Sequence, residues 1–239
     1  MTNKLQVADY KKILARIKKA CLQANRDVAG IELVAVSKGQ EFDKIKALYA
    51  LGHRLFGESY LDELVTKAAY FAKSAADIEW FFLGRLQSNK IQKIVQIASQ
   101  IHSLSSFKHA RYIQKYAKAL NKTPYPVYIQ LNPTLEPTKA GVSFNELFSL
   151  VEFIEAETTD LSLQGIMVLP PPLSAASGES ILQAKNLYKE LRRTADKVGQ
   201  GRLSLGMSQD LDLAILSGSD TVRVGRDLFG QRAKNISKK

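Results

Sequence analysis

Residues Leu33 to Gly39 read Leu-Val-Ala-Val-Ser-Lys-Gly, an unbroken apolar run followed by a lysine and a turn residue. Runs of this kind are typical of strands that are buried on both faces of a parallel sheet. In α/β proteins ligands gather at the carboxyl ends of such strands, and Lys38 stands at that end. The stretch therefore predicts a buried strand that delivers one amine to the functional edge of a sheet.

Similar short apolar runs recur along the chain, and stretches with helical spacing of apolar residues separate them. We expect strands over 33–38, 54–58, 79–83, 101–104, 126–132, 163–168, 202–205 and 221–224. We expect helices over 5–24, 42–51, 60–74, 90–99, 107–120, 144–156, 179–198 and 209–216, with a short last helix after Gly225.

This unbroken alternation of strands and helices predicts parallel strands joined by right-handed crossovers. With 239 residues the chain is close to the usual size of an eight-fold barrel, about 250 residues. The prediction is an α/β fold: a single (β/α)8 TIM-type barrel with an extra N-terminal helix, one domain over 1–239. A doubly wound open sheet is the alternative, but it gives the lysine and the late glycine turns no reason to converge.

The composition is that of a globular protein, because 45% of the residues are hydrophobic and 24% are charged. The first residues, Met1 to Gln6, lack the apolar stretch of a signal peptide, and no later window has transmembrane length. A cytoplasmic location is therefore expected. The single Cys21 cannot form an internal disulfide. It lies in a stretch with helical spacing, and its side chain is expected to pack into the protein core.

The formal net charge of +11 raises the question of nucleic-acid binding. The lysines and arginines are spread along helices, rather than gathered in one arm or beside stacking aromatic residues, so a solvated basic surface is favoured. The densest basic stretch is 232–239, and 233–239 is expected to be a frayed tail. A monomer is expected.

Two glycine-containing strand ends near the end of the chain predict an anion site. A closed barrel places the first strand beside the eighth, so Lys38 shares one mouth with Ser208 and Gly225. Barrels bind phosphate in the loops after strands seven and eight. Gly206 and Gly225 let the backbone approach an anion closely, and the Ser208 hydroxyl adds a donor.

A lysine amine opposite a phosphate cradle is what pyridoxal phosphate (PLP) requires, because the amine forms an imine with the aldehyde. Arg223 stands where it could reach the ring nitrogen. Arginine only donates hydrogen bonds, which keeps that nitrogen unprotonated and the ring a weaker electron sink. A solvated strand-end lysine and a serine that caps a helix are the simpler alternatives.

Other chemistry has little support in the sequence. His53, His102 and His109 show no metal-ligand spacing with Cys21 or with carboxylates, and no serine and histidine pair can be argued. Asp210 and Asp212 favour the start of a helix, where negative charge complements the helix dipole.

A series of short motifs spans nearly the whole chain. They are Leu33–Lys38, Phe56–Glu58, Gly84 with Leu86–Lys90, Ile101–Ser103, Lys139 with Gly141, Gly165–Met167, Ser204–Ser208, and Val222–Gly225 with Phe229–Gly230. In number and order they resemble the pyridoxal phosphate homeostasis proteins, which share their barrel with the N-terminal domain of bacterial alanine racemase.

The resemblance implies that Lys38 holds PLP as an internal aldimine. It also implies that Ser208 and the backbone at Gly225 and Arg226 hold the phosphate, and that Arg223 meets the ring nitrogen. The expected cofactor contacts are Lys38, Ser59, Gly206, Met207, Ser208, Arg223, Gly225 and Arg226, with no catalytic residue and no metal ligand.

Seven residues, at five places in the chain, depart from the family pattern. Ser59 stands for an asparagine, Phe81 for a histidine and Ser105 for an aspartate. Gly39–Gln40 replaces threonine and lysine, and Arg226–Asp227 replaces a small hydroxyl residue followed by alanine. The last change removes a phosphate donor, but the backbone N–H remains and the Arg226 cation is expected to compensate.

The expected function is intracellular PLP homeostasis, in which the protein holds PLP and releases it, with PLP-dependent apoenzymes as partners and without efficient turnover of amino acids. The alternative is a PLP-dependent, racemase-like enzyme. Related two-domain racemases need a second base from another domain and subunit, for which 239 residues leave no room, and no tyrosine or histidine can be placed opposite Lys38. A nucleic-acid-binding barrel is a third class, marked by steep salt dependence.

Overall fold

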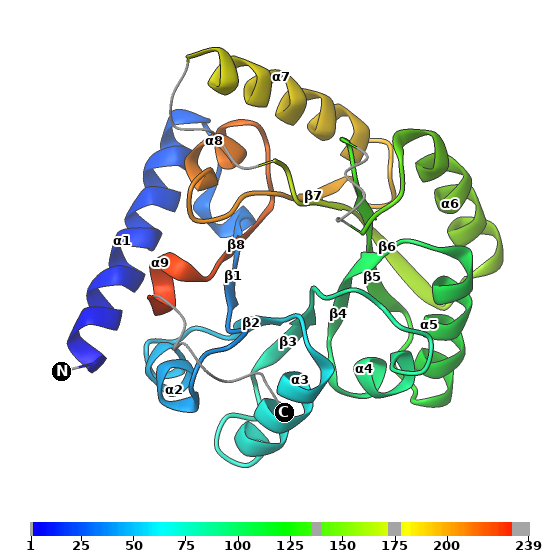
Figure 1. Ribbon diagram of the computed structural model, residues 1–239, viewed down its shortest axis with the longest axis horizontal. Helices are drawn as coiled ribbons and strands as arrows, with labels where there is room; N and C mark the ends of the chain where they lie inside the picture. The colour runs from blue at the N-terminus through cyan, green and yellow to red at the C-terminus, as the bar shows by residue number, and fades with distance from the viewer. Residues whose placement is uncertain (1, 135–139, 172–177, 231–239) are drawn as a thin grey trace.

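The computed structural model describes residues 2–134, 140–171 and 178–230. Its strands form a ring that helices surround (Figure 1). The strands are β1 (Glu32–Val36), β2 (Leu55–Glu58), β3 (Glu79–Phe82), β4 (Gln100–Leu104), β5 (Tyr125–Leu131), β6 (Leu161–Val168), β7 (Arg202–Ser204) and β8 (Thr221–Val224).

All neighbouring strands are parallel, and the sheet closes into a barrel in the order β1 to β8. Closure comes from the pairing of β1 with β8, in which Val34 lies opposite Arg223 and Ala35 opposite Val224. This pairing confirms the predicted barrel, and it excludes the open sheet. The first and last strand ends therefore share one mouth, as expected.

The helices lie outside the ring, and each begins and ends close to its predicted bounds. They are α1 (Thr2–Gln23), α2 (Phe42–Ala50), α3 (Leu61–Phe71), α4 (Ile91–Ile97), α5 (Phe107–Ala119), α6 (Phe144–Glu157), α7 (Gly178–Ala195), α8 (Leu211–Leu216) and α9 (Arg226–Phe229). The described residues also include a 3-10 turn, η1 (Val28–Gly30), which was not predicted. The Asp27 carboxylate caps it by accepting the N–H of Ala29 at 3.0 Å.

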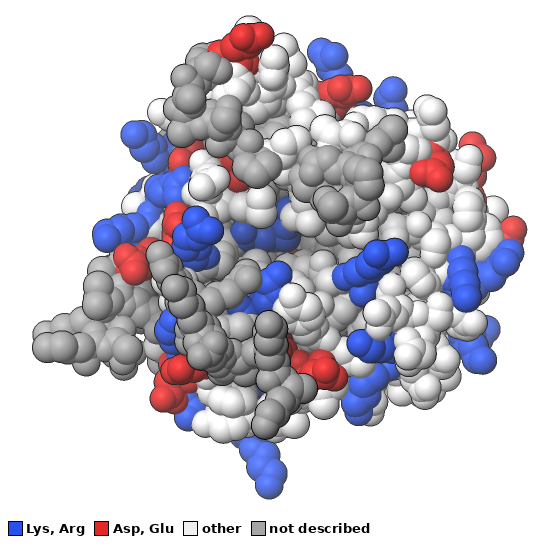
Figure 2. Space-filling view, in the orientation of Figure 1, with Lys and Arg blue, Asp and Glu red and all other residues white. Residues whose placement is uncertain are grey.

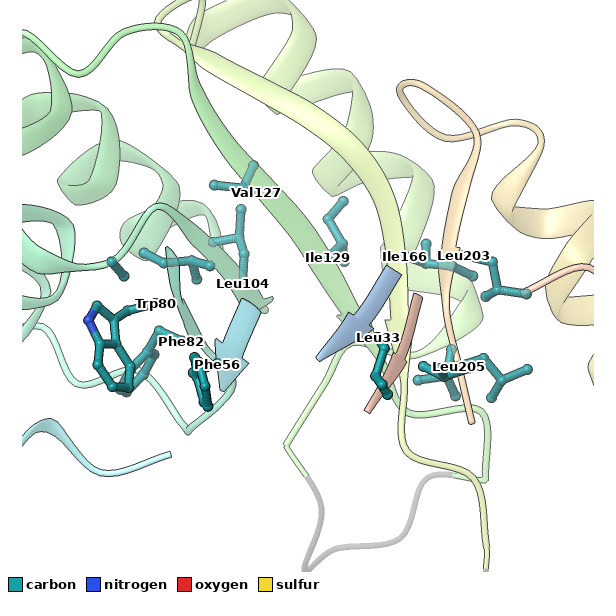
Figure 3. Packing of buried hydrophobic residues seen from close by; sticks show 14 of the residues in the cluster. Leu33, Phe56, Trp80, Phe82, Leu104, Val127, Ile129, Ile166, Leu203 and Leu205 are labelled. Carbon is teal, nitrogen blue, oxygen red and sulfur yellow. The ribbon is translucent and has the colours of Figure 1, made fainter. Parts of the chain in front are cut away.

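Side chains alternate between the two faces of each strand. The outward side chains pack under the helices in one apolar cluster, part of which Figure 3 shows. Outward residues from eight strands include Leu33, Phe56, Trp80, Ile101, Val127, Ile166, Leu203 and Val222. The inward residues are more polar, since His102, Tyr128, Ser204 and Arg223 are buried outside that cluster. Charge and hydrogen bonds therefore reach the barrel axis.

The extra N-terminal helix covers the side of the barrel where the ends of the sheet meet. α1 packs against α2, α8 and α9. Ile13, Ile17, Ala20 and Cys21 recur at helical spacing and are buried beneath it. The prediction that Cys21 fills the core is confirmed. No helix in the described ranges is long and apolar enough to cross a membrane.

Candidate functional site

Lys38 follows β1 directly after Ser37, at the carboxyl end of the barrel. Val34 faces the barrel axis, and the alternation along the strand aims Lys38 to the same side. Gly39 has a φ of 68°, so the chain turns sharply behind the lysine. The Nζ atom of Lys38 lies 5.4 Å from the ring centre of Tyr60, which follows β2.

Tyr60 is a neighbour of Lys38 that the sequence analysis did not identify. No tyrosine or histidine could be placed opposite Lys38 from the sequence, and in the structure the Tyr60 ring lies beside its amine. The available signal was its place just after Ser59, at the end of the strand that neighbours β1. The Tyr60 side chain is 58% exposed, so it stands at the rim of the mouth and not inside the barrel.

A buried ionic cluster lies behind Lys38, on the outer side of the sheet. Lys67 of α3 donates from Nζ to three oxygens at 2.7 Å each: the carbonyl of Ser37, Oε1 of Glu58 and Oε2 of Glu63. The Ser37 hydroxyl donates to the same Oε1 of Glu58 at 2.6 Å, and the N–H of Gly39 donates to Glu63 Oε2 at 2.7 Å. Sequence motifs included Glu58 but gave no role to Lys67 or Glu63.

Two of the three charges of this cluster, those of Lys67 and Glu58, are almost wholly removed from water. The side chains of Lys67 and Glu58 are 5% and 0% exposed. Burial raises the pKa of the Glu58 carboxyl, whereas the charge and the hydrogen bond of Lys67 oppose that rise. Within the described ranges Glu58 Oε2 has no hydrogen-bond partner. The cluster therefore holds the β1 end firmly at a cost in desolvation.

Arg223 occupies the barrel interior. Its Nη1 donates to Ser204 Oγ at 2.6 Å, and its Nη2 donates to the carbonyl of Val168 at 2.7 Å. Burial lowers the pKa of Arg223 to about 10, whereas the nearby Asp210 and Tyr188 raise it. The guanidinium thus keeps its proton at neutral pH and acts only as a donor.

His102 lies behind Ser204, where the charged form of its ring is disfavoured. Its Nδ1 is 3.3 Å from Ser204 Oγ, and its Nε2 is 3.3 Å from Gln100 Oε1. Burial, and then the charge of Arg223, lower the pKa of His102 well below its usual value. Because Ser204 accepts from Arg223, its own proton points to Nδ1 and leaves the Nε2 proton for Gln100.

The loop after β7 is a fixed turn. Gly206 has a φ of 101°, and a Cβ there would lie 2.6 Å from Ala214 Cβ, so glycine is required. The Met207 N–H donates to Asp210 Oδ1 at 2.7 Å, and the Tyr188 hydroxyl donates to Asp210 Oδ2 at 2.5 Å. Asp210 therefore shapes the turn that presents Ser208. The Met207 N–H is already hydrogen-bonded within this turn.

Gly225 joins β8 to α9 beside the end of β1. A Cβ on Gly225 would lie 3.3 Å from the Val36 carbonyl oxygen, which shows how closely the two strand ends approach. The N–H groups of a first helical turn have no partner within the helix, and here they belong to Arg226 and its neighbours. Arg226 itself is exposed at the rim.

An arginine of α1 connects the segment that follows β7 with the segment that follows β8. Arg16 donates from Nη2 to Asp212 Oδ2 at 2.7 Å, and from Nη1 to the Ser208 carbonyl at 3.1 Å and to Asp227 Oδ2 at 3.3 Å. The carboxylates of Asp212 and Asp227 are thereby neutralised from the α1 side. This contact was not predicted, because Arg16 is far away in the sequence.

Ser59 also lies at this end, directly after β2. A Cβ on Gly84 would lie 1.9 Å from the Ser59 carbonyl oxygen, so the turn after β3 presses against Ser59. The structure places every predicted contact position around one mouth. Figure 2 shows Lys and Arg side chains in the hollow at the centre of this face. Lys139 and the 233–239 tail lie outside the described residues.

The opposite end of the barrel holds a cavity of about 570 Å³. Its charged side chains pair with each other: Arg202 with Glu32 at 3.1 Å, and Arg192 with Asp220 at 2.9 Å. Within the described ranges no group of three or more His, Cys, Asp or Glu side chains is placed to hold a metal ion. These ion pairs at the amino ends of the strands are typical of stability rather than of ligand binding.

Several basic residues of α5 lie beside aromatic rings, which the sequence analysis did not indicate. Lys108 lies over the ring of Tyr112, and Lys115 over that of Tyr116. Arg111 lies 4.9 Å from the ring centre of Phe153 and also pairs with Glu157 at 3.0 Å. These cations are engaged by side chains of the same chain, which is the ordinary arrangement on a solvated helix.

Comparison with known proteins agrees with this geometry. The family model of the alanine racemase N-terminal domain matches residues 9–233. A pyridoxal phosphate homeostasis protein of Haemophilus influenzae is 33% identical over 94% of this chain and 95% of its own length. One of Caenorhabditis elegans is 38% identical over 84% of this chain and 85% of its own.

Solved structures of related proteins have the same fold as this chain. PipY of Synechococcus elongatus, solved with PLP bound, is 30% identical, with a TM-score of 0.72 over 91% of this chain and 100% of its own. Alanine racemase of Bartonella henselae, at 18% identity, shares the fold, with a TM-score of 0.71 over 97% of this chain and 60% of its own. The chain belongs to the pyridoxal phosphate homeostasis protein family, whose barrel is that of the alanine racemase N-terminal domain.

Proposed function

We propose that this protein serves PLP homeostasis: it binds PLP at the carboxyl end of its barrel, holds it through Lys38, and releases it to PLP-dependent apoenzymes in the cytoplasm. The observation that carries the proposal is the convergence of an inward lysine, a buried donor-only arginine and a glycine-bounded turn at one mouth. The name of the homologous family and the PLP-bound PipY structure support the same ligand.

The residues fit the three polar parts of PLP. The Lys38 amine suits the aldehyde: a carbon–nitrogen double bond forms and one water leaves. The Ser208 hydroxyl and the backbone N–H groups at Gly225 and Arg226 suit the phosphate. Arg223, which keeps its proton, suits the ring nitrogen. Gly206, Met207 and Ser59 shape the surrounding wall.

When bound, PLP supplies an electron sink, and a protonated ring nitrogen makes that sink strong. Arg223 has no acceptor and cannot support that protonation. The Tyr60 ring lies near Lys38, but Tyr60 stands exposed at the rim. We therefore propose a carrier with negligible turnover of amino acids.

Covalent capture tests the binding proposal. Purified protein is mixed with PLP, reduced with borohydride and digested, and the modified peptide is identified by mass spectrometry. Label on Lys38, and loss of the visible absorption band in Lys38→Ala, are expected. Lys93→Ala, an exposed lysine on α4, is the matched control and should label normally. Label mainly on another lysine would contradict the assignment.

Two further measurements separate the carrier from an enzyme. Loaded protein should transfer PLP to an apoenzyme, which is read out as recovered activity of that enzyme. The same loaded protein should leave each common L-amino acid unchanged in configuration and composition over hours. Robust turnover by pure protein that is lost in Lys38→Ala would replace the carrier proposal with the racemase-like alternative.

A further inference from the structure

We infer that Lys67 and Glu63 of α3 are positioning residues for Lys38: they hold the backbone on both sides of it and thereby aim its amine at the barrel axis. The inference rests on the proposed function, because it concerns the same site. Lys67 and Glu63 contact the backbone beside Lys38, and the inference gives them no contact with a ligand.

The residue before Lys38 is held at every polar atom. The Ser37 N–H donates to the Gly57 carbonyl at 3.0 Å, which continues the pairing of β1 with β2. Its hydroxyl donates to Glu58 at 2.6 Å, and its carbonyl accepts from Lys67 at 2.7 Å. Ser37 therefore has one orientation, with its side chain on the outer face of the sheet.

The residue after Lys38 is held by the same cluster. The Gly39 N–H donates to Glu63 Oε2, and that oxygen also accepts from Lys67. The two peptide groups that flank Lys38 are thus joined by a bridge of two side chains. Neither peptide can rotate without breaking a hydrogen bond to a charged group, the stronger kind of hydrogen bond.

This bridge determines where the Lys38 side chain points. Successive side chains of an extended chain lie on opposite faces, so an outward Ser37 requires an inward Lys38. A shift of one residue would send the amine outward, into the space beneath α3. The strand ends here in a turn that the Gln40 N–H closes by donating to the Ser37 carbonyl at 3.0 Å, and the bridge from α3 holds both peptide groups of Lys38 against such a shift.

Stability alone explains the cluster poorly. Buried ion pairs are often no more stabilising than apolar residues of the same size, because both charges lose their water. Here two carboxylates share one ammonium, and Glu58 Oε2 gains no partner in the described part of the chain. An arrangement with these costs is better explained by the geometry that it imposes on residues 37–39.

Glu63 gives the most informative variants, because its side chain is 29% exposed and its loss should leave the core folded. Glu63→Gln keeps an oxygen for the Gly39 N–H, whereas Glu63→Ala removes it. Asp62→Ala is the matched control, since Asp62 is an exposed acidic residue in the same helical turn. Lys67→Met removes all three donors, and it is examined only if its thermal unfolding remains cooperative.

The experiment compares PLP with 4′-deoxypyridoxine 5′-phosphate, which has the ring and phosphate but no aldehyde. For Glu63→Ala we expect about tenfold weaker PLP binding, which is the effect of one hydrogen bond to a charged group. We also expect PLP to become fixed on Lys38 more slowly when borohydride reduces the imine. Affinity for the analogue should stay unchanged. Glu63→Gln should restore most of the PLP affinity, and Asp62→Ala should match the wild type.

Each other result has a definite meaning. Equal loss of affinity for PLP and for the analogue shows a general disturbance of the site and overturns the positioning role. Unchanged PLP affinity and labelling rate in Glu63→Ala overturn it as well. If wild-type protein itself does not label at Lys38, the proposed function fails first, which is distinguishable because no variant is needed to see it.

Discussion

Arg223 Nη1 lies 2.6 Å from Ser204 Oγ, so the cation inside the barrel is bound to the neighbouring strand β7. Its other terminal nitrogen is held by the Val168 carbonyl at 2.7 Å. Two fixed hydrogen bonds set the plane of the guanidinium. A side chain that is prepared in this way loses little conformational freedom when it meets a ligand.

We therefore predict that Arg223→Lys weakens the binding of both PLP and its deoxy analogue about tenfold, because a point charge cannot replace the planar fork. Equilibrium titration followed by absorbance or fluorescence measures both affinities. Arg193→Lys, an exposed arginine on α7, is the control and should bind as the wild type does. Undiminished affinity in Arg223→Lys would place the ring nitrogen elsewhere.

The phosphate contact gives a second prediction. Ser208→Ala should cost about 1 to 3 kcal/mol of PLP binding energy if the hydroxyl donates to the charged phosphate. Gly225→Val should cost more, since an added Cβ would lie 3.3 Å from the Val36 carbonyl oxygen and the larger side chain would block the approach of an anion. Ser217→Ala, at the other end of α8, serves as the control.

Pyridoxal, which lacks the phosphate, provides the decisive comparison for these variants. Its weak binding should be the same in wild type and Ser208→Ala. Equal losses for pyridoxal and PLP would mean that Ser208 supports the mouth in general and does not meet the phosphate.

The fold could be predicted because it depends on local periodicity. β8 has the predicted bounds, and closure followed from the count and order of strands. Helix ends were less accurate: α7 ends at Ala195 rather than Val198, because the chain turns through Gly199 at a φ of 53°. Turn conformations of this kind depend on tertiary packing, which residue spacing does not reveal.

The site could be predicted only where it depends on strand ends. Lys38, Ser208 and Gly225 each follow a strand, so chain order alone brings them to one mouth. Lys67 lies within a helix, where a lysine ordinarily faces solvent, and its burial depends on Glu58 from another element. Arg16 likewise finds its partners only after the chain has folded. Long-range pairs leave no periodic signal in one sequence.

Arg16 supports a third prediction, about stability. It joins α1 to Asp212 and Asp227, but these side chains are about one-third to one-half exposed. Water and salt screen such pairs, so a double-mutant cycle of Arg16→Gln with Asp212→Asn should give a coupling free energy of about 0.5 to 1 kcal/mol. The more exposed pair of Lys12 and Asp9 is the control cycle, with a smaller coupling. Chemical denaturation measures both, and equal couplings would contradict the view that Arg16 fastens the loops.

The last relationship concerns protons. His53 is buried between α1 and β2, with Nε2 2.8 Å from the Leu55 carbonyl and Nδ1 3.3 Å from the Tyr10 hydroxyl. Because a carbonyl only accepts, Nε2 carries the proton, and Nδ1 accepts from Tyr10. Burial, opposed by the Leu55 hydrogen bond and helped by the nearby Arg54 charge, lowers the pKa of His53 to about 4.

The shift fixes how stability depends on pH. The folded pKa of His53, about 4, lies below the ordinary value of 6.5, so between these pH values the unfolded chain binds the proton and the native protein does not. The free energy of unfolding should therefore fall as the pH falls from 6.5 to 4, with a contribution from His53 of up to about 3 kcal/mol.

In His53→Asn that contribution disappears, so the free energy measured by urea unfolding should fall less over this range. His102 acts in the same direction and should leave a residual slope in the variant. His109→Gln is the control, because His109 is only half-buried and its replacement should change the slope less. An identical pH dependence in wild type and His53→Asn would show that His53 accepts its proton in the native state as readily as in the unfolded chain.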